Sequence, residues 1–135
     1  MLVPNCPVCH QSVALAARTL EAAGIITVIT GCAKNIVEHV GVPRFIFSDF
    51  ALGNAAGRPN DPECQFDILC MALELSVSAT LARTTVRSKF EWSKNQNWKE
   101  DYSNPDKLSA TEIAERRKAF DDTNNMTKRI SPTEK

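Results

Sequence analysis

The sequence predicts an α/β fold: a small three-layer domain with a short, mainly parallel sheet, followed by a polar and helical C-terminal extension. Two observations predict this fold. Residues 25–30 and 44–48 are short apolar runs of the kind found in strands buried on both faces of a parallel sheet. A helical pattern precedes each run, and this alternation indicates βαβ units with right-handed crossovers.

The elements before the first predicted strand surround a pair of cysteines. Residues 1–4 are expected to form the end of a strand that leads into a loop carrying Cys6 and Cys9. Residues 11–23 then form a helix, and Gly24 ends it because glycine readily adopts the left-handed conformation of a helix C-terminus. The two thiols are therefore expected at or just before a helix N-terminus.

Three connections are expected to meet at one edge of the sheet. Residues 31–33 form a turn after the first predicted strand, and residues 34–40 form a short helix. Residues 49–60 contain two glycines, Asn54 and Pro59, which are typical of a loop. With the thiol loop, these connections should lie at the carboxyl ends of the strands, where open parallel sheets bind their ligands.

Asp61 and Pro62 predict the start of a long helix that runs to about Leu81, because Asp is a favourable N-cap and Pro a favourable first helical residue. An apolar stripe on this helix is expected to pack on the sheet. Its members are Phe66, Leu69, Cys70, Leu73 and Val77. Cys64 and Cys70 are expected to be structural, since cysteines are common in packed interiors.

The composition changes after residue 90, so we divide the chain into a half-domain at 1–90 and an extension at 91–135. Residues 91–102 are polar with isolated aromatics, as in a segment that lies across a surface. Ser109 and Glu112 predict a capping box for a helix at 108–120, followed by a flexible tail at 121–135. Two strands and a stub make a narrow sheet, which favours a homo-oligomer or a larger complex.

Charge and composition exclude several classes of function. The chain has 16 basic and 16 acidic residues, seven of each up to residue 90 and nine of each beyond it. No basic field is present for nucleic acid or a membrane surface, and the apolar runs are too short for a membrane helix. Five cysteines with no apparent secretion signal predict a cytoplasmic protein whose thiols are reactive, not structural disulfides.

The motif Cys6-Pro7-Val8-Cys9-His10 is the strongest functional signal in the sequence. Unpaired N–H groups and the helix dipole favour a thiolate at a helix N-terminus, so redox or covalent sulfur chemistry is the leading interpretation. C-x-x-C-H is also the attachment motif of c-type haem. A zinc site of Cys6, Cys9 and His10 with a distant Cys32, or two inert cysteines, are the remaining alternatives.

Several segments together resemble the glycine/sarcosine/betaine/D-proline reductase family, in particular its component B selenoproteins. In that family a U-x-x-C-H motif, where U is selenocysteine, precedes a helix that ends Glu-Ala-Ala-Gly-Ile-Pro-Thr. This sequence has Cys6 to His10 followed by Glu21-Ala22-Ala23-Gly24-Ile25, and Ile26 replaces the family's proline. Val42-Pro43-Arg44 and the loop at 53–60 also match, so the resemblance covers roughly residues 1–90, the C-terminal half of the family domain, in a cysteine form.

The resemblance implies a thiol-dependent oxidoreductase that cleaves a C–N bond of a small carboxylate or amino-acid-like substrate. Cys6 takes the selenocysteine position as the nucleophile, and Cys9 is the resolving thiol. His10 is grouped with them as catalytic, and a thioredoxin-like donor restores the dithiol. No other cofactor and no metal is expected. Residues proposed to bind substrate are Gly53, Asn54, Gly57, Arg58 and Cys32. The alternative is a non-catalytic or redox-sensing subunit that completes a larger reductase complex.

Overall fold

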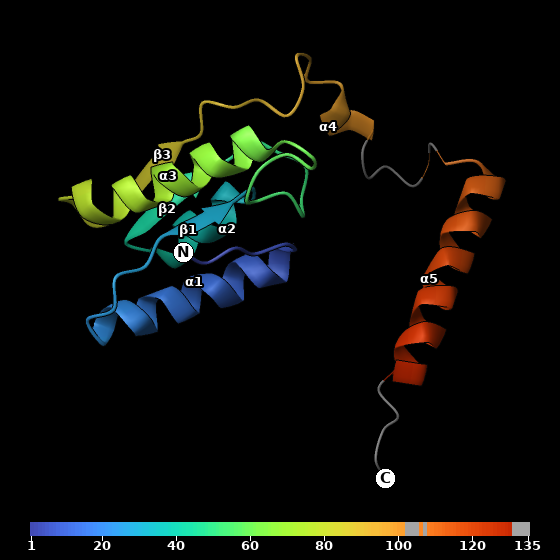
Figure 1. The fold of residues 1–135 in the computed structure, drawn as a ribbon, viewed down its shortest axis with the longest axis horizontal. Coiled ribbons are helices and arrows are strands. Elements are labelled where there is room, and N and C mark those ends of the chain that lie inside the picture. The colour runs from blue at the N-terminus through green and yellow to red at the C-terminus, as the bar shows by residue number, and fades with distance from the viewer. Residues whose placement is uncertain (102–105, 107, 131–135) are drawn as a thin grey trace, which may run out of the picture. The chain divides into compact units, whose positions relative to one another are not determined.

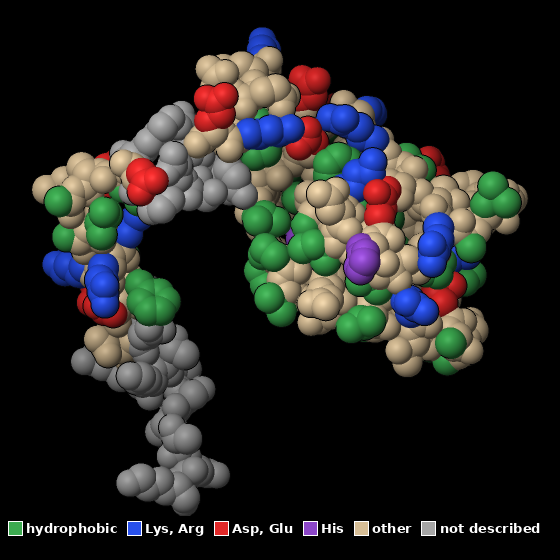
Figure 2. Space-filling view, turned by 180° about the vertical axis from the view of Figure 1, so that it is seen from behind, with side chains coloured by type: hydrophobic (Ala, Val, Ile, Leu, Met, Phe, Trp, Pro, Cys, Tyr) green, Lys and Arg blue, Asp and Glu red, His purple; other side chains and the backbone are tan. Residues whose placement is uncertain are grey.

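The computed structural model describes residues 1–101, 106 and 108–130. The chain separates into two compact units, Met1–Asn95 and Gln96–Lys135. The first unit holds the sheet and three helices, and the second holds two further helices. Side chains of both charge signs are interspersed over the face of the first unit that Figure 2 shows, in keeping with the balanced composition.

The first unit contains a three-stranded sheet in which all strands run parallel (Figure 1). Strands β1 (Ile29–Gly31), β2 (Arg44–Phe47) and β3 (Thr84–Arg87) lie side by side in the order β1-β2-β3. Leu2 extends the sheet by one bridge: its N–H donates to the Val28 carbonyl at 2.9 Å, and its carbonyl accepts from the Thr30 N–H at 3.1 Å. These residues confirm the predicted α/β fold and the strand end before the thiol loop.

Helices cover both faces of the sheet. Helices α1 (Pro7–Ala22) and α2 (Lys34–Val40) lie on one face, and α3 (Pro62–Ser78) lies on the other (Figure 1). Successive residues of β2 supply the two cores, since Phe45 faces α1 and α2 while Ile46 faces α3. The first core contains Ala14, Ala17, Ile29 and Val37, and the second contains Val28, Ala72 and Leu75. The three predicted layers are therefore present.

The first predicted strand is wrong at its start. Strand β1 begins at Ile29, and Ile25 and Ile26 are 53% and 62% exposed. The Ile25 N–H donates to the Leu20 carbonyl at 2.9 Å, and the hydroxyl of Thr27 donates to Glu21 at 2.9 Å. The C-terminus of α1 therefore holds residues 25–27, which in the prediction belonged to the sheet.

Strand β3 was not predicted. Its sequence, Thr-Thr-Val-Arg, is β-branched but polar, and it forms the edge of the sheet with three half-buried residues and an exposed Arg87. The ladder is secured at each end, where the Thr84 N–H donates to Pro43 O at 3.0 Å and the Ser88 N–H donates to Phe47 O at 2.8 Å. An edge strand needs no alternation of apolar and polar residues. The short β-branched run was therefore the one sequence feature that indicated this strand.

Helix α3 starts as predicted and buries a different face. Asp61 is its N-cap and accepts from the Cys64 N–H at 3.0 Å, and the helix ends at Ser78, before the predicted Leu81. The predicted stripe does not pack on the sheet, since its large apolar side chains Phe66, Leu69, Leu73 and Val77 are exposed. The packed residues are Cys64, Ile68, Ala72 and Leu75. Helix α3 has two apolar faces, and the face with the small Ala72 allows close approach to the sheet.

The second unit contains α4 (Trp98–Asp101) and α5 (Ala110–Ile130). The predicted capping box is present: the Ser109 N–H donates to Glu112 at 2.9 Å, and the Glu112 N–H donates to Ser109 Oγ at 3.3 Å. Helix α5 continues beyond the predicted end at Phe120, so the predicted tail is wrong for residues 121–130. Tyr102 and residues 131–135 lie outside the described residues. Within the part of the chain that the structure describes, no helix is long and apolar enough to cross a membrane.

Candidate functional site

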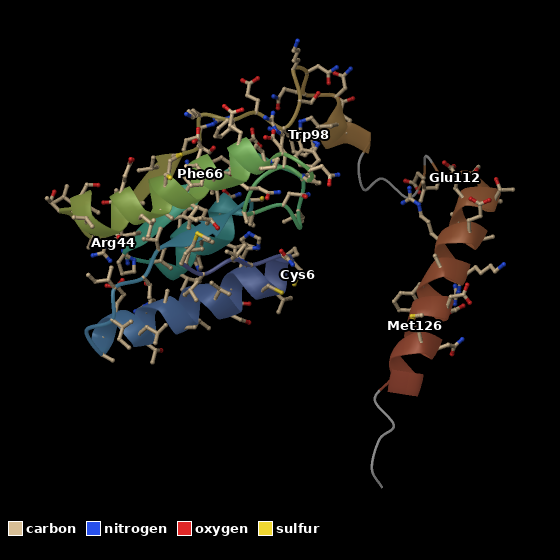
Figure 3. The ribbon with its side chains drawn as sticks, viewed as in Figure 1. Cys6, Arg44, Phe66, Trp98, Glu112 and Met126 are labelled. Atoms are coloured by element: carbon tan, nitrogen blue, oxygen red, sulfur yellow. The ribbon has the colours of Figure 1, made fainter. Side chains whose placement is uncertain are left out.

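Cys6 is the N-cap of helix α1 (Figure 3). Its backbone is extended, and its Sγ accepts a hydrogen bond from the Cys9 N–H at 3.2 Å. Pro7 follows at the start of the helix, a position where a missing N–H leaves no helical hydrogen bond unmade. The Cys6 side chain is exposed. An accessible thiol that accepts an N–H at a helix N-terminus is well placed to react as a thiolate.

Cys9 lies in the first turn of α1 and interacts with the Cys6 thiol. Hydrogen bonds from the side chain and then the backbone of Cys6 hold the pKa of Cys9 below its ordinary value. Both cysteines are free thiols. A thiol that stabilises the anion of its neighbour is the arrangement required for thiol–disulfide exchange, in which one sulfur attacks and the other resolves.

His10 is fully buried beneath this pair and bonds to the backbone on two sides. Its Nδ1 lies 2.7 Å from the Cys6 carbonyl oxygen, so this nitrogen carries the proton and donates. Its Nε2 accepts from the N–H groups of Cys32 at 3.1 Å and Ala33 at 3.3 Å. Both ring nitrogens are therefore used to join the first turn of α1 to the end of β1. This geometry makes His10 a positioning residue for Cys6.

Gly31 makes room for the His10 ring. A Cβ at residue 31 would lie 2.9 Å from His10 Cδ2 and 3.1 Å from Phe45 Cε2, closer than side-chain carbons pack. The last residue of β1 must therefore be glycine if the imidazole is to reach the two N–H groups that follow it. The sequence reading treated this glycine as part of a turn and missed the contact.

Cys32 lies at the same edge of the sheet as the dithiol and is half-buried. Its side chain packs against the cluster of Phe50, Cys64 and Ile68. Burial raises the pKa of the Cys32 thiol to about 11, an effect that hydrogen bonds from the backbone at Phe50 and Asn54 only partly offset. The thiol is therefore neutral at pH 7. Cys32 thus lies beside the loop at 49–60, as the topology predicted. In the structure its side chain packs against apolar neighbours.

The glycine-rich loop is folded on itself and against α3. The Asn54 side chain donates to the Ala51 carbonyl at 3.1 Å, and the Gly57 N–H donates to Asn54 O at 3.1 Å. Gly53 and Gly57 both have positive φ, 93° and 131°. A Cβ on Gly57 would lie 2.7 Å from Gln65 Cγ, so this glycine also permits close approach to the first turn of α3.

Arg58 already holds a carboxylate within the protein. Its Nε and Nη2 donate to Asp61 Oδ2 at 2.9 Å and 2.6 Å, and its Nη1 donates to the Glu91 carbonyl at 3.0 Å. The guanidinium also lies 5.7 Å from the Phe90 ring centroid. The Cys64 N–H and then Arg58 lower the pKa of Asp61. The predicted carboxylate-binding side chain therefore supports the N-terminus of α3 in this structure.

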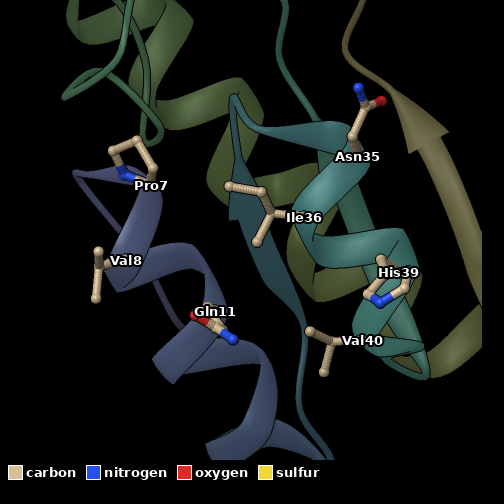
Figure 4. Close-up of a pocket in the computed structure, with 7 residues that line it drawn as sticks. All are labelled: Pro7, Val8, Gln11, Asn35, Ile36, His39 and Val40. Atoms are coloured by element: carbon tan, nitrogen blue, oxygen red, sulfur yellow. The ribbon is translucent and has the colours of Figure 1, made fainter.

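A groove of about 400 Å³ lies between the first turns of α1 and helix α2 (Figure 4). Its apolar lining comes from Pro7, Val8, Ile36 and Val40, and its polar lining from Gln11, Asn35 and His39. Two of these residues, Pro7 and Val8, stand between Cys6 and Cys9 in the sequence. His39 is an exposed residue in the last turn of α2 that also lines this groove.

An ion pair links two of the segments on which the family resemblance rests. Arg44 Nη1 donates to Glu21 Oε1 at 2.7 Å, and Glu21 also accepts from the N–H and the hydroxyl of Thr27. Burial tends to raise the pKa of Glu21, but the hydrogen bonds from Thr27 and Arg44 outweigh it and lower that pKa. The sequence reading assigned neither charged residue a role. The structure gives both a role in fixing the end of α1 on β2.

The residues that the structure describes contain no group of three or more His, Cys, Asp or Glu side chains that could hold a metal ion. The orientation of His10 explains why the C-x-x-C-H motif does not gather such a group. Both ring nitrogens bond to the backbone, so the imidazole and the two thiols do not converge on one point.

Comparison with known proteins gives one informative similarity. No protein-family model and no solved structure matches the chain. The chain is 30% identical over 92 residues to D-proline reductase subunit gamma of Acetoanaerobium sticklandii, a match that covers 68% of this chain and 38% of that subunit. The chain therefore spans well under two thirds of the length of this relative. The chain is therefore similar to one part of a proline reductase subunit.

Proposed function

We propose that the chain is a thiol-dependent oxidoreductase subunit in which Cys6 and Cys9 form the redox centre. The observation that carries the proposal is the position of Cys6: an exposed N-cap whose Sγ accepts the Cys9 N–H at 3.2 Å. The pKa of Cys9, which hydrogen bonds from Cys6 lower, supports a reactive thiolate within the pair. The similarity to a D-proline reductase subunit supports a reductase with an amino acid as substrate class.

The proposed reaction is a reductive cleavage of the C–N bond next to a carboxylate. Cys6 acts as the nucleophile, and Cys9 closes the Cys6–Cys9 disulfide. The two thiols lose two electrons and two protons as the S–S bond forms. The C–N bond takes up both: the carbon gains a proton, and the nitrogen leaves as an amine. A thioredoxin-like dithiol then reduces the disulfide and returns the site to its starting state.

The proposed substrate is a small carboxylate or amino-acid-like molecule that meets Cys6 at the carboxyl edge of the sheet. Gly53, Asn54, Gly57 and Arg58 remain the proposed binding loop. Arg58 would bind a substrate carboxylate by exchanging it for Asp61. Replacing Arg58 with Lys should then raise KM several-fold and leave the Cys6–Cys9 chemistry intact. An unchanged KM would assign Arg58 to the N-terminus of α3 alone.

A larger reductase complex is the proposed working assembly, located in the cytoplasm. The relative that the chain resembles over part of its length is a reductase subunit, which supports an assembly of several subunits. The same observation favours a second candidate function, a non-catalytic or redox-sensing subunit of that complex. Turnover of the complex separates the two candidates.

The test combines alkylation with turnover. In the reduced full-length chain, Cys6 and Cys9 should be alkylated at neutral pH, and mild oxidation should give a Cys6–Cys9 disulfide by mass spectrometry. Cys6→Ser and Cys9→Ser should abolish turnover of the reconstituted complex, while Cys70→Ser, a half-buried thiol on α3, should not. Unchanged turnover in Cys6→Ser with complex formation intact would establish the non-catalytic subunit. Failure to form the disulfide would refute the oxidoreductase and the redox-sensing role, and would leave the non-catalytic subunit.

A further inference from the structure

Helix α3 carries a row of large apolar side chains on the side that faces away from the sheet. Phe66, Leu69, Leu73 and Val77 are 65%, 40%, 60% and 88% exposed. At 100° per residue they lie opposite the buried face, and the row spans about 16 Å of helix. Single exposed apolar residues are ordinary, whereas a continuous row of four marks a surface that another molecule covers. We call these four residues the α3 stripe (Figure 3 labels Phe66).

Carboxylates border the α3 stripe on one side. Glu63, Asp67 and Glu74 fall within about 40° of one another on the helix, next to the stripe, and α3 contains no Lys or Arg. Lys89, from the segment after β3, bonds to Asp67 at 2.8 Å, and the pKa of Lys89 is raised by Asp67 and further by Glu63 and Glu74. Arg87 lines the same hollow as Lys89 but is paired with Asp49 at 3.2 Å, so the four carboxylates outnumber the two cations and this border stays negative. The opposite border has the neutral Ser76.

This charge pattern distinguishes between possible occupants. A second copy packed antiparallel through a two-fold axis would set the carboxylate border against the same border of its partner, which is repulsive. A second copy packed parallel would set it against the neutral border with Ser76, which leaves the carboxylates unneutralised. A helix with Lys or Arg along one side of an apolar row satisfies both features of the stripe at once.

We propose that the α3 stripe is the docking surface for an amphipathic helix of another subunit, with apolar side chains bordered on one side by Lys or Arg. This inference names the kind of partner in the proposed reductase complex, and it rests on that complex but not on the thiols. The failure of one is therefore distinguishable from the failure of the other, because the alkylation of Cys6 and Cys9 does not depend on α3.

The experiment uses two synthetic helical peptides with the same leucine row, one bordered by Lys and the other by Glu. Their binding to the full-length chain is measured by fluorescence anisotropy at low and high salt. We expect the Lys peptide to bind at least about tenfold more tightly than the Glu peptide, with the difference falling as salt screens the charges. Glu63→Gln with Glu74→Gln should remove most of that difference.

Matched variants locate the binding surface. Leu73→Gln with Val77→Gln should abolish binding of the Lys peptide, while Leu15→Gln, at a residue of α1 that is 52% exposed, should not. Equal binding of both peptides, or binding of neither, would overturn the inference. Sedimentation of the chain alone provides the last control. A dimer that Leu73→Gln with Val77→Gln dissociates would overturn it as well, since a second copy would then cover the stripe.

Discussion

The His10 ring connects the first turn of α1 to the end of β1 through hydrogen bonds to three backbone groups. Removing the ring leaves the part-buried N–H groups of Cys32 and Ala33 without their acceptor, while the Cys6 carbonyl keeps its bond from the backbone N–H of residue 10 at 3.0 Å. An imidazole that bonds twice to backbone N–H groups through Nε2 has its proton on Nδ1. The backbone conformation of Cys6 as N-cap therefore depends on the His10 side chain, which bonds to the Cys6 carbonyl oxygen and not to the Cys6 sulfur.

We predict that His10→Ala lowers the free energy of unfolding by about 3 kcal/mol, from lost packing and unpaired buried groups. It should also shift the pH midpoint of Cys9 alkylation upward, because the first turn that holds the Cys9 thiol beside Cys6 becomes mobile. His39→Ala, at an exposed site, should change stability by less than about 0.5 kcal/mol. Denaturant unfolding and mass-spectrometric alkylation measure the two effects. An unmoved alkylation midpoint would limit His10 to stability.

Cys32 yields a prediction about pH. Its pKa in the folded chain is about 11, above the ordinary value for a thiol, because burial disfavours the thiolate. Folding therefore stabilises the protonated thiol. That contribution is complete below the unfolded pKa of ~8.5 and is lost as pH rises through the folded pKa.

In native protein at pH 8, we expect alkylating reagent to modify Cys6 and Cys9 at least tenfold faster than Cys32, and all three equally after unfolding. Cys32→Ala should flatten the fall in stability between pH 8.5 and pH 11. Site-resolved rates and denaturant titrations at several pH values provide the readout. Rapid modification of native Cys32 at pH 8 would show that its thiol reaches solvent.

At the scale of elements, the sequence located the helices well where chain-local chemistry decides them. Lys34–Val40 was predicted to the residue, because Gly41 (φ 78°) ends it, and the capping groups Asp61 and Ser109 were read correctly. The dithiol at a helix N-terminus was also predictable, since both cysteines and the helix are adjacent in sequence. Helix α1 begins at Pro7, before the predicted start at residue 11, so Cys9 lies inside its first turn.

Features set by distant partners were not predictable. The partners of His10 are 22 and 23 residues away, so the motif gave no sign that its ring nitrogens bond to Cys32 and Ala33. Helix α3 has two apolar faces of similar periodicity, and only the sheet selects between them. Likewise, Arg58 is a type of side chain that binds carboxylates, and in the structure it binds the carboxylate of the nearby Asp61.

The Glu21–Arg44 pair makes the joint between α1 and β2 sensitive to acid. The depressed pKa of Glu21 means that its stabilisation is present above the unfolded pKa of ~4.3 and is lost as pH falls through the folded value. We expect Glu21→Gln to cost ~2 kcal/mol at pH 7, because Thr27 and Arg44 lose a charged acceptor. Glu38→Gln, in an exposed pair at 3.8 Å, should cost less than about 0.5 kcal/mol. A pH dependence of stability in Glu21→Gln that matches the parent between pH 5 and pH 3 would contradict the assignment.

At the scale of the whole molecule, the boundary between the two units can be placed more sharply than composition allows. Composition changes at residue 90, whereas the first compact unit ends at Asn95. Two contacts of residues 91–95 explain the difference. The Trp92 ring packs on Phe50 with centroids 5.7 Å apart, and the Glu91 carbonyl accepts from Arg58 at 3.0 Å. All three apolar clusters lie within Met1–Asn95.

We therefore predict that a fragment of residues 1–95 folds with its cores intact, and that a fragment of residues 1–90 is less stable by about 2–4 kcal/mol. The shorter fragment loses a half-buried tryptophan and exposes the cluster of Phe50, Cys64 and Ile68. Denaturant unfolding of the two fragments, with Trp92→Ala in the longer one, measures the difference. Trp92→Ala should account for most of it, because the aromatic side chain supplies most of the buried area. Equal stability of the two fragments would move the boundary back to residue 90 and make residues 91–95 part of the extension.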